Sequence, residues 1–248
     1  MTFALLLALC TRLTVPLAVP IEPADGNAIL QRIDAQLQNT KSQILTLDMA
    51  IEDPGHEPRR IGLQMHMRGD KRRVAFLYPG DMKGMQVLNL SAEQTYVYLP
   101  AFRKVRRIAS HLRDQTLFGS DYTFDDFGNI ALHQNYHGAI VHEDADYWHM
   151  TATPKTGTEP AAEHIELRVK KTSHTVEELK YFDATGTLSR TETRGDFQCS
   201  DSGCAPRKTK MVNHRHDNHW TEVTISRMQL NVDFPEHIFS LRALQRNE

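Results

Sequence analysis

The stretch that decides the fold runs from Arg72 to Phe127 and reads RRVAFLYPGDMKGMQVLNLSAEQTYVYLPAFRKVRRIASHLRDQTLFGSDYTFDDF. It contains three short runs rich in Val, Leu and Tyr, at residues 73–78, 85–90 and 95–99. Turn-forming residues separate these runs, beginning with Pro79 and Gly80. Short apolar runs between turns indicate strands joined as an antiparallel meander. We therefore expect a sheet at the centre of the fold.

The same pattern continues on both sides of this stretch. Residues 60–67 alternate strictly, which places Ile61, Leu63, Met65 and Met67 on one face. Further strands are predicted at residues 43–51, 138–142, 147–153, 164–169, 177–182, 188–197, 208–214 and 220–230. Roughly ten to twelve short strands with few helices favour a sandwich or an open barrel. No repeat or linker interrupts them, so we expect one domain over residues 25–248.

One clear helix is predicted at residues 25–37. Asp25 stands at its start, where a carboxylate can cap free backbone N–H groups. Ile29, Ile33 and Leu37 recur every four residues and form one apolar stripe. Such a stripe must lie on an apolar surface, and we expect the concave side of the sheet to provide it.

Charge is balanced overall but uneven along the chain. The formal net charge is 29 − 31 = −2, which gives no basis for nucleic-acid binding. Residues 68–113 carry ten basic and three acidic residues, and residues 114–146 carry seven acidic and no basic residues, hence +7 and −7. The two blocks either pair with each other in the fold or form a polar face that steers a partner or lipid headgroups.

The first 24 residues indicate a secretory leader. Residues 1–9 are almost entirely apolar, but the run is too short to span a bilayer, which needs about 20 apolar residues. We expect export to the periplasm. Leu9 precedes Cys10 and is large for lipoprotein processing, so we do not expect lipidation, although anchoring at the outer membrane stays open as an alternative.

The other two cysteines, Cys199 and Cys204, bracket a turn-rich Ser-Asp-Ser-Gly. In an exported protein we expect them to form a disulfide, with free thiols or a shared metal ion as alternatives. His214, His216 and His219 form a second metal candidate. Thirteen histidines make such a cluster probable by chance, so we predict no metal and no cofactor.

No catalytic motif is present. The chain lacks a Gly-x-Ser-x-Gly elbow, a phosphate loop, a dinucleotide glycine triplet and a His-Glu-x-x-His pair. Asp121, Asp125 and Asp126 are capable of acid–base work in principle. A surface cluster beside a basic strand explains them better, and we predict no enzymatic activity.

The central stretch resembles a known family. Its ordered motifs are Arg73-x-x-Phe76-x-x-Pro79, Asp81-Met-Lys-Gly84, Tyr96-x-Tyr-Leu-Pro100, Arg103-Lys-Val-Arg-Arg-Ile108 and Phe118-Gly-Ser-Asp121. In this order they resemble the outer-membrane lipoprotein-sorting (LolA-like) family, and more narrowly its periplasmic branch distinct from LolA proper. The resemblance implies a LolA/LolB-like unclosed antiparallel barrel that is covered by short helices and holds acyl chains. It implies no catalytic residues. LolA proper holds its lid with an arginine, and no single arginine here matches it.

This resemblance and the apolar pattern give the candidate sites. Residues expected at the lipid-binding cavity or its mouth are Met65, Met67, Phe76, Met82, Met85, Val97, Leu99, Phe118, Tyr122 and Phe127. Methionine suits varied apolar ligands, and ordinary core filling is the alternative. The aromatic residues at 118–127 either pin a loop to the core or line the mouth. Lid candidates are the helix at 25–37 and residues 110–127.

A basic cluster completes the set. Arg103, Lys104, Arg106 and Arg107 are expected to contact lipid headgroups or a membrane partner. The predicted function is a monomeric periplasmic carrier or chaperone for acyl chains of a lipid or lipoprotein, acting toward the outer membrane. An inner-membrane transporter is a candidate partner. The alternative is a ligand-free exported subunit of an envelope transporter complex.

Overall fold

The structure is a computed structural model that describes residues 25–38, 40–91, 94–109, 116–123, 126, 131–158, 162–200 and 203–246. The expected leader at residues 1–24 lies outside this part of the chain.

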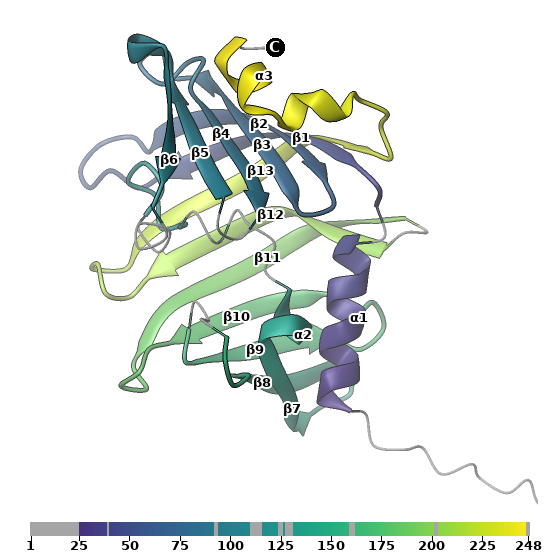
Figure 1. Ribbon diagram of the computed structural model, residues 1–248. Coiled ribbons are helices and arrows are strands. Elements are labelled where there is room, and N and C mark those ends of the chain that lie inside the picture. Colours follow the sequence, from purple (N-terminus) through teal and green to yellow (C-terminus); the bar gives the residue numbers. More distant parts are fainter. Residues whose placement is uncertain are drawn as a thin grey trace, which may run out of the picture.

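One curled antiparallel sheet of thirteen strands makes up most of the protein (Figure 1). The strands are β1 (Gln43–Ile51), β2 (Arg59–Arg68), β3 (Lys71–Tyr78), β4 (Gln86–Ser91), β5 (Gln94–Leu99), β6 (Lys104–Ile108), β7 (Tyr136–Glu143), β8 (Tyr147–Pro154), β9 (His164–Lys170), β10 (Val176–Phe182), β11 (Leu188–Ser200), β12 (Gly203–Asn213) and β13 (His219–Leu230). Their order is β6-β5-β4-β3-β2-β1-β13-β12-β11-β10-β9-β8-β7. Because β6 and β7 are unpaired edges, the barrel is unclosed, which confirms the predicted fold class.

The strand count exceeds the expected range by one. The additional strand is β6, a short polar segment that pairs with β5, for example Val97 opposite Arg106. An edge strand is hydrogen-bonded on one side only and needs no apolar run, so its sequence gives a weak strand signal.

The core lies on the concave face of the sheet. Residues 61, 63 and 65 of β2 are buried on this face, as their alternation predicts. Neighbouring strands supply most of the rest of this core. Over both faces of the sheet and the helices, the largest fully buried side chains among the described residues are Leu30, Met49, Ile51, Ile61, Leu63, Leu88, Met150, Ile165, Leu179, Met211, Leu244 and Gln86.

Helix α1 (Gly26–Gln38) covers the β7 end of this face, in the lower half of Figure 1. Asp25 caps the helix by accepting a hydrogen bond from the N–H of Asn27 at 3.0 Å. A methyl group on Gly26 would lie 2.4 Å from the carbonyl oxygen of Gly138 in β7. Only glycine allows this close approach, and it lets Leu30 become completely buried. The short α2 (Leu132–Asn135) packs against the same end.

The C-terminal segment packs on the opposite, convex face. It comprises the 3-10 helix η3 (Glu236–Phe239) and helix α3 (Leu241–Arg246). Phe239 and Leu244 form a second apolar cluster there with Leu88 and Tyr98. Phe234 and Phe239 therefore pack outside the barrel, on its convex face.

The two blocks of opposite charge do not pair with each other through the ion pairs between described residues. Arg68 and Lys71 of the basic block pair with Glu236 near the C-terminus. Asp126 of the acidic block pairs with Arg190 in β11. These members of the two blocks are therefore paired with segments distant in sequence.

The tip of the β11–β12 hairpin carries a disulfide between Cys199 and Cys204. Gln36 of α1 lies against this tip, with its side chain 3.1 Å from the position of a methyl group on Gly203. Gln36 also donates a hydrogen bond to the carbonyl of Ser173 at 2.8 Å. The hairpin tip thus supports the C-terminal part of the helix.

Replacing Cys199 with serine should lower the free energy of unfolding by about 2 kcal/mol, because a link across a short loop restricts the unfolded chain. Urea unfolding of the oxidised protein and the variant measures the difference. The reduced wild-type protein is the control and should match the variant. Equal stability of oxidised and reduced protein would contradict this prediction.

Candidate functional site

The candidate site lies on the concave face of β3, β4 and β5. Cross-strand partners share a face of a sheet, so the register builds two rows here. Val74 and Val87 lie opposite each other in one row, and Arg72, Asn89 and Thr95 form the next.

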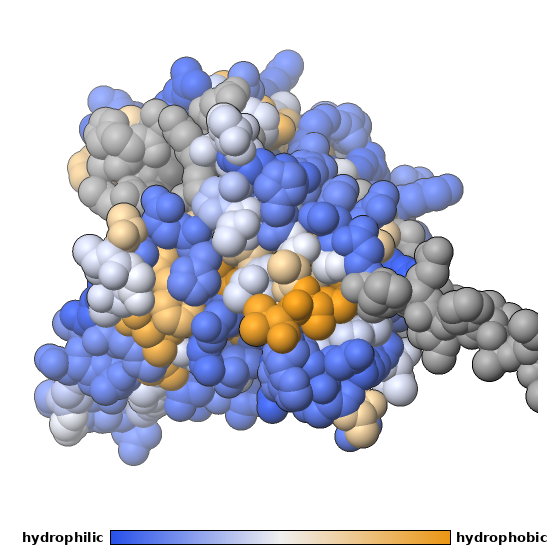
Figure 2. Space-filling model, turned by 90° about the horizontal axis from the view of Figure 1, so that it is seen from below, coloured by the Kyte–Doolittle hydropathy of each residue, from blue (hydrophilic) through white to orange (hydrophobic). Residues whose placement is uncertain are grey.

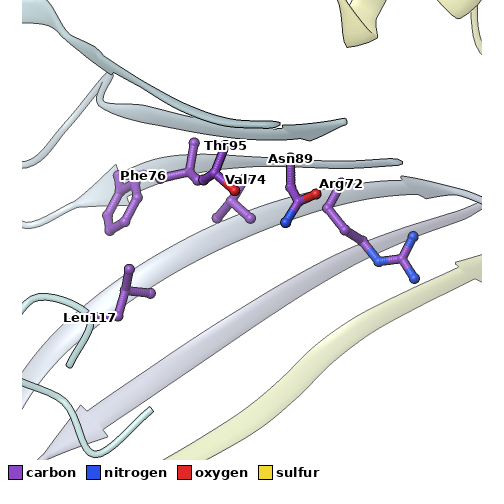
Figure 3. A pocket seen from close by; sticks show the side chains of 7 residues that line it. Arg72, Val74, Phe76, Asn89, Thr95 and Leu117 are labelled. Carbon is purple, nitrogen blue, oxygen red and sulfur yellow. The ribbon is translucent and has the colours of Figure 1, made fainter. Parts of the chain in front are cut away.

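A pocket opens between these rows. Its lining residues are Arg72, Val74, Phe76, Val87, Asn89, Thr95 and Leu117. Leu117 faces Phe76 across the pocket, and Arg72 lies at the other end with its guanidinium directed away from Phe76 (Figure 3). The free space amounts to about 20 Å³ for the centre of a water-sized molecule, which is enough for one or two waters. An acyl chain therefore enters only if part of the wall moves.

Leu117 belongs to a segment of the wall that lies outside the named strands. This segment, residues 116–123, folds back on itself through a bridge between Thr116 and Thr123. Phe118 adopts φ of 53°, a left-handed conformation that is costly for a bulky residue. In this conformation its ring packs edge-on against Phe76, with centroids 4.8 Å apart. Leu117 and Phe118 together plug the pocket.

Two carboxylates fasten this plug to the sheet. The first, Asp121, is 2% exposed and accepts hydrogen bonds from the Thr221 hydroxyl at 2.8 Å and from the His219 ring at 2.8 Å. The other ring nitrogen of His219 faces the carbonyl oxygen of Glu52 at 3.1 Å. Asp121 thus ties the plug to β13.

The second carboxylate, Asp126, forms an ion pair with Arg190 of β11 at 2.6 Å, with side chains 4% and 13% exposed. Arg190 also donates a hydrogen bond to the carbonyl of Asp121 at 3.2 Å. Its guanidinium lies 4.9 Å from the ring centroid of Tyr181. Arg190 therefore contacts both anchor residues of the plug.

A buried polar belt extends from this pair along β11, where residues 190, 192 and 194 share the concave face. Glu192 is 6% exposed and accepts hydrogen bonds from Arg194 at 2.8 Å and Tyr181 at 3.0 Å. Burial would raise the pKa of Glu192, but the charge of Arg194 and these hydrogen bonds outweigh it and lower the pKa. Burial also raises the pKa of Tyr122, which contacts Thr209 beside the belt.

The described residues among those predicted to bind lipid belong to the main core or pack against it. Met65, Phe76, Met85, Val97 and Tyr122 are buried in the main core. Four more pack against it while partly exposed: Met67, Met82, Leu99 and Phe118. Of this set, Phe76 lines the pocket. Phe127 lies outside the described residues.

The residues predicted to meet headgroups lie at the β6 edge and are exposed. Arg103 follows the 3-10 helix η1 (Pro100–Phe102) with φ of 50°. Lys104 pairs with Leu99 and Arg106 with Val97, so both point to the concave face beside the apolar lining. Arg107 points to the other face.

The histidine cluster is occupied by other contacts. His214 contacts Thr191 and Asn218 through its two ring nitrogens, at 2.8 and 2.7 Å. His214 and His216 follow the end of β12 and do not share a strand. Within the described ranges, no three His, Cys, Asp or Glu residues are grouped to hold a metal ion. No helix among these residues is both long and apolar enough to cross a membrane.

The sequence analysis names Asp121 and Asp126 but does not predict that they anchor the segment or that Leu117 lines a pocket. Residues 110–127 are predicted as a possible lid, but the anchor partners Arg190 and His219 lie 64 and 98 residues from Asp126 and Asp121. The sequence holds one signal for this buried polar belt: charged residues stand at every second position, 190, 192 and 194, of a predicted strand and therefore share one face. The residues between them, Thr191 and Thr193, are also polar, so the alternation does not show which face is buried.

The unclosed barrel with its plugged apolar face is a LolA-like fold, and comparison with known structures agrees. A domain from Vibrio parahaemolyticus named for outer-membrane lipoprotein sorting superposes with a TM-score of 0.80 at 20% identity, covering 89% of this chain and 98% of that one. A LolA superfamily protein from Nitrosomonas europaea gives 0.74 at 17% identity, covering 89% and 100%. At such identities the likeness concerns the fold alone.

A family model described as "Uncharacterized protein" matches residues 68–246, and the chain belongs to this family. A DUF1329 family protein from Desulfovibrio piger superposes with a TM-score of 0.80 at 20% identity, covering 88% of this chain and 97% of that one. No curated protein sequence matches the chain. The membership agrees with the suspected LolA-like superfamily.

Proposed function

We propose that this protein is a monomeric periplasmic carrier or chaperone that takes up acyl chains of a lipid or lipoprotein on the concave face of its sheet, for transfer toward the outer membrane. The observation that carries the proposal is the apolar pocket of an unclosed barrel whose outer wall is a plug, Leu117 and Phe118, rather than a strand. No catalytic step is required.

The energetics of uptake favour a chain that replaces the plug. Each CH₂ group removed from water contributes about 0.8 kcal/mol. Leu117 and Phe118 already occupy apolar surface at Phe76. A ligand chain that displaces them replaces their contacts with this surface, and its remaining CH₂ groups form further contacts. The Asp121 and Asp126 anchors oppose this displacement, which keeps the face closed when no ligand is present.

Lys104 and Arg106 suit the polar end of such a ligand. They lie on the concave face in register with Leu99 and Val97. A chain along the inner face of β5 would therefore place an anionic headgroup near two exposed cations. We propose this pair as the headgroup contact within the carrier function.

The alternative is an exported accessory subunit without a ligand. The close packing of the interior favours it, because the free space holds only one or two waters. An inner-membrane transporter complex is the partner class in that case. The two functions differ in whether lipid travels with the protein.

Native mass spectrometry of protein released gently from a bacterial periplasm tests the proposal. The carrier should retain a lipid mass, and the delipidated protein should take up palmitate. Val87→Phe, which fills the pocket, should weaken palmitate binding about tenfold, the equivalent of about two CH₂ contacts at about 0.8 kcal/mol each. Leu117→Ala should strengthen binding because it enlarges the pocket.

Val141→Phe is the matched control, because Val141 is 68% exposed on the edge strand β7. Strand β7 lies at the lower end of the molecule in Figure 1, and the view from below shows hydrophobic areas within a mostly hydrophilic surface (Figure 2). Palmitate binding should be unchanged in this variant. A folded protein that retains no lipid, ignores palmitate and pulls down an envelope complex would support the accessory subunit instead.

A further inference from the structure

A basic and apolar surface lies outside the interior, at the β6 edge. We call it the basic edge face; its residues are Phe102, Arg103, Lys104, Arg106, Arg107, Leu241, Arg242 and Arg246. All eight are exposed. Phe102 is 66% exposed and Leu241 41% exposed, which are high values for large apolar side chains.

Tertiary packing brings two distant parts of the sequence into this face. Val105 of β6 and Leu244 of α3 belong to the same apolar cluster on the convex face, so α3 lies against β6. In Figure 1 the β5–β6 end and α3 are both at the top of the molecule. The packing leaves Arg242 and Leu241 outward beside the basic strand.

The eight named residues include six basic side chains and no acidic one. Neither residues 100–109 nor residues 240–246 include an aspartate or glutamate. Among the described residues, none forms an ion pair with Arg103, Lys104, Arg106 or Arg242. Lysines on other strands differ: Lys180 pairs with Glu178 and Lys208 with Glu222.

Protection of the sheet edge explains only part of the composition of the basic edge face. Lysine and arginine on an edge strand prevent pairing with another sheet, and β6 is an edge. That role needs no exposed Phe102 and gives no reason for arginines on α3. Basic side chains around protruding apolar ones are instead the composition of surfaces that bind anionic membranes.

We propose that the basic edge face docks the protein on an anionic lipid bilayer. Phe102 and Leu241 enter the interfacial region while the surrounding cations bind lipid phosphates. Since Lys104 and Arg106 also border the concave face, docking brings the opening of the interior to the bilayer. This inference goes beyond the carrier proposal and does not require an acyl chain inside the barrel.

Sedimentation with vesicles tests it. Wild-type protein should bind vesicles of phosphatidylcholine mixed with phosphatidylglycerol, bind vesicles of phosphatidylcholine alone far more weakly, and lose binding as salt rises. The variant Arg103→Gln/Lys104→Gln/Arg106→Gln/Arg242→Gln should bind the anionic vesicles more than about tenfold more weakly, since each basic residue near the surface accounts for about fivefold. Phe102→Ser should weaken binding without changing its salt dependence.

The control removes four exposed charges elsewhere: Arg32→Gln/Lys41→Gln/Arg215→Gln/Arg227→Gln. It has the same net charge as the test variant and should bind like wild type. Equal loss in both variants would overturn the proposal in favour of a net-charge effect. Self-association of the test variant with unchanged vesicle binding would overturn it in favour of edge protection. Palmitate uptake by the wild-type protein, measured separately, reports on the carrier function, so a failure of vesicle binding is distinguishable from a failure of palmitate uptake.

Discussion

Replacing Arg190 with methionine should lower the free energy of unfolding by about 3–5 kcal/mol, because it leaves the Asp126 carboxylate buried without its partner. Arg190 is 13% exposed and Asp126 4% exposed, so solvent cannot replace the lost contact. Chemical denaturation measures the loss. Unchanged stability would show that the pair contributes nothing net to the fold.

The same variant should loosen the plug. Amide hydrogen exchange at residues 116–123 should speed up before global unfolding, because Arg190 also holds the carbonyl of Asp121. Palmitate uptake should become faster. The double variant Arg190→Met/Asp126→Leu is the control: it replaces the pair by apolar groups and should recover most of the stability. If exchange at 116–123 stayed slow, the plug would be held by its apolar contacts alone.

Replacing Glu192 with leucine should lower the free energy of unfolding by a similar amount at neutral pH, about 3–5 kcal/mol. The reason is that the Arg194 guanidinium is then left in the buried polar belt without its carboxylate partner. Glu178→Leu is the matched control, since Glu178 pairs with Lys180 where both side chains are about a third exposed. That substitution should cost no more than about 1 kcal/mol.

The pH dependence gives a second measure of Glu192. Its pKa is lowered in the folded protein, so its stabilisation is present above the pKa of an unfolded glutamate and is lost as the pH falls through the folded pKa. The difference between wild type and Glu192→Leu should therefore narrow in acid. Denaturation curves from neutral pH down to about pH 3 test this, and a constant difference would contradict it.

The sheet itself was largely predictable. Strict alternation placed Ile61, Leu63 and Met65 on one face, and turn residues such as Pro79 and Gly80 divided the meander. The basic strand at residues 103–108 was left out of the strand count, because an edge strand needs no apolar run and its signal is weak. The basic residues there were singled out, but α3 was not placed beside them, since residues 241–246 are far from β6 in sequence.

The sequence by itself determined the local structure: the period of the apolar residues selects strands, Asp25 starts a helix, and the cysteine spacing around a turn allows a disulfide. Only the tertiary structure decided that Leu117 and Phe118 fill the space beside Phe76 and that Arg190 and His219 fasten them. The physical reason is the separation along the sequence of the residues that interact. Strand and turn preferences act between near neighbours along the chain, whereas plug, anchors and basic edge face depend on side chains that meet only after the sheet has curled.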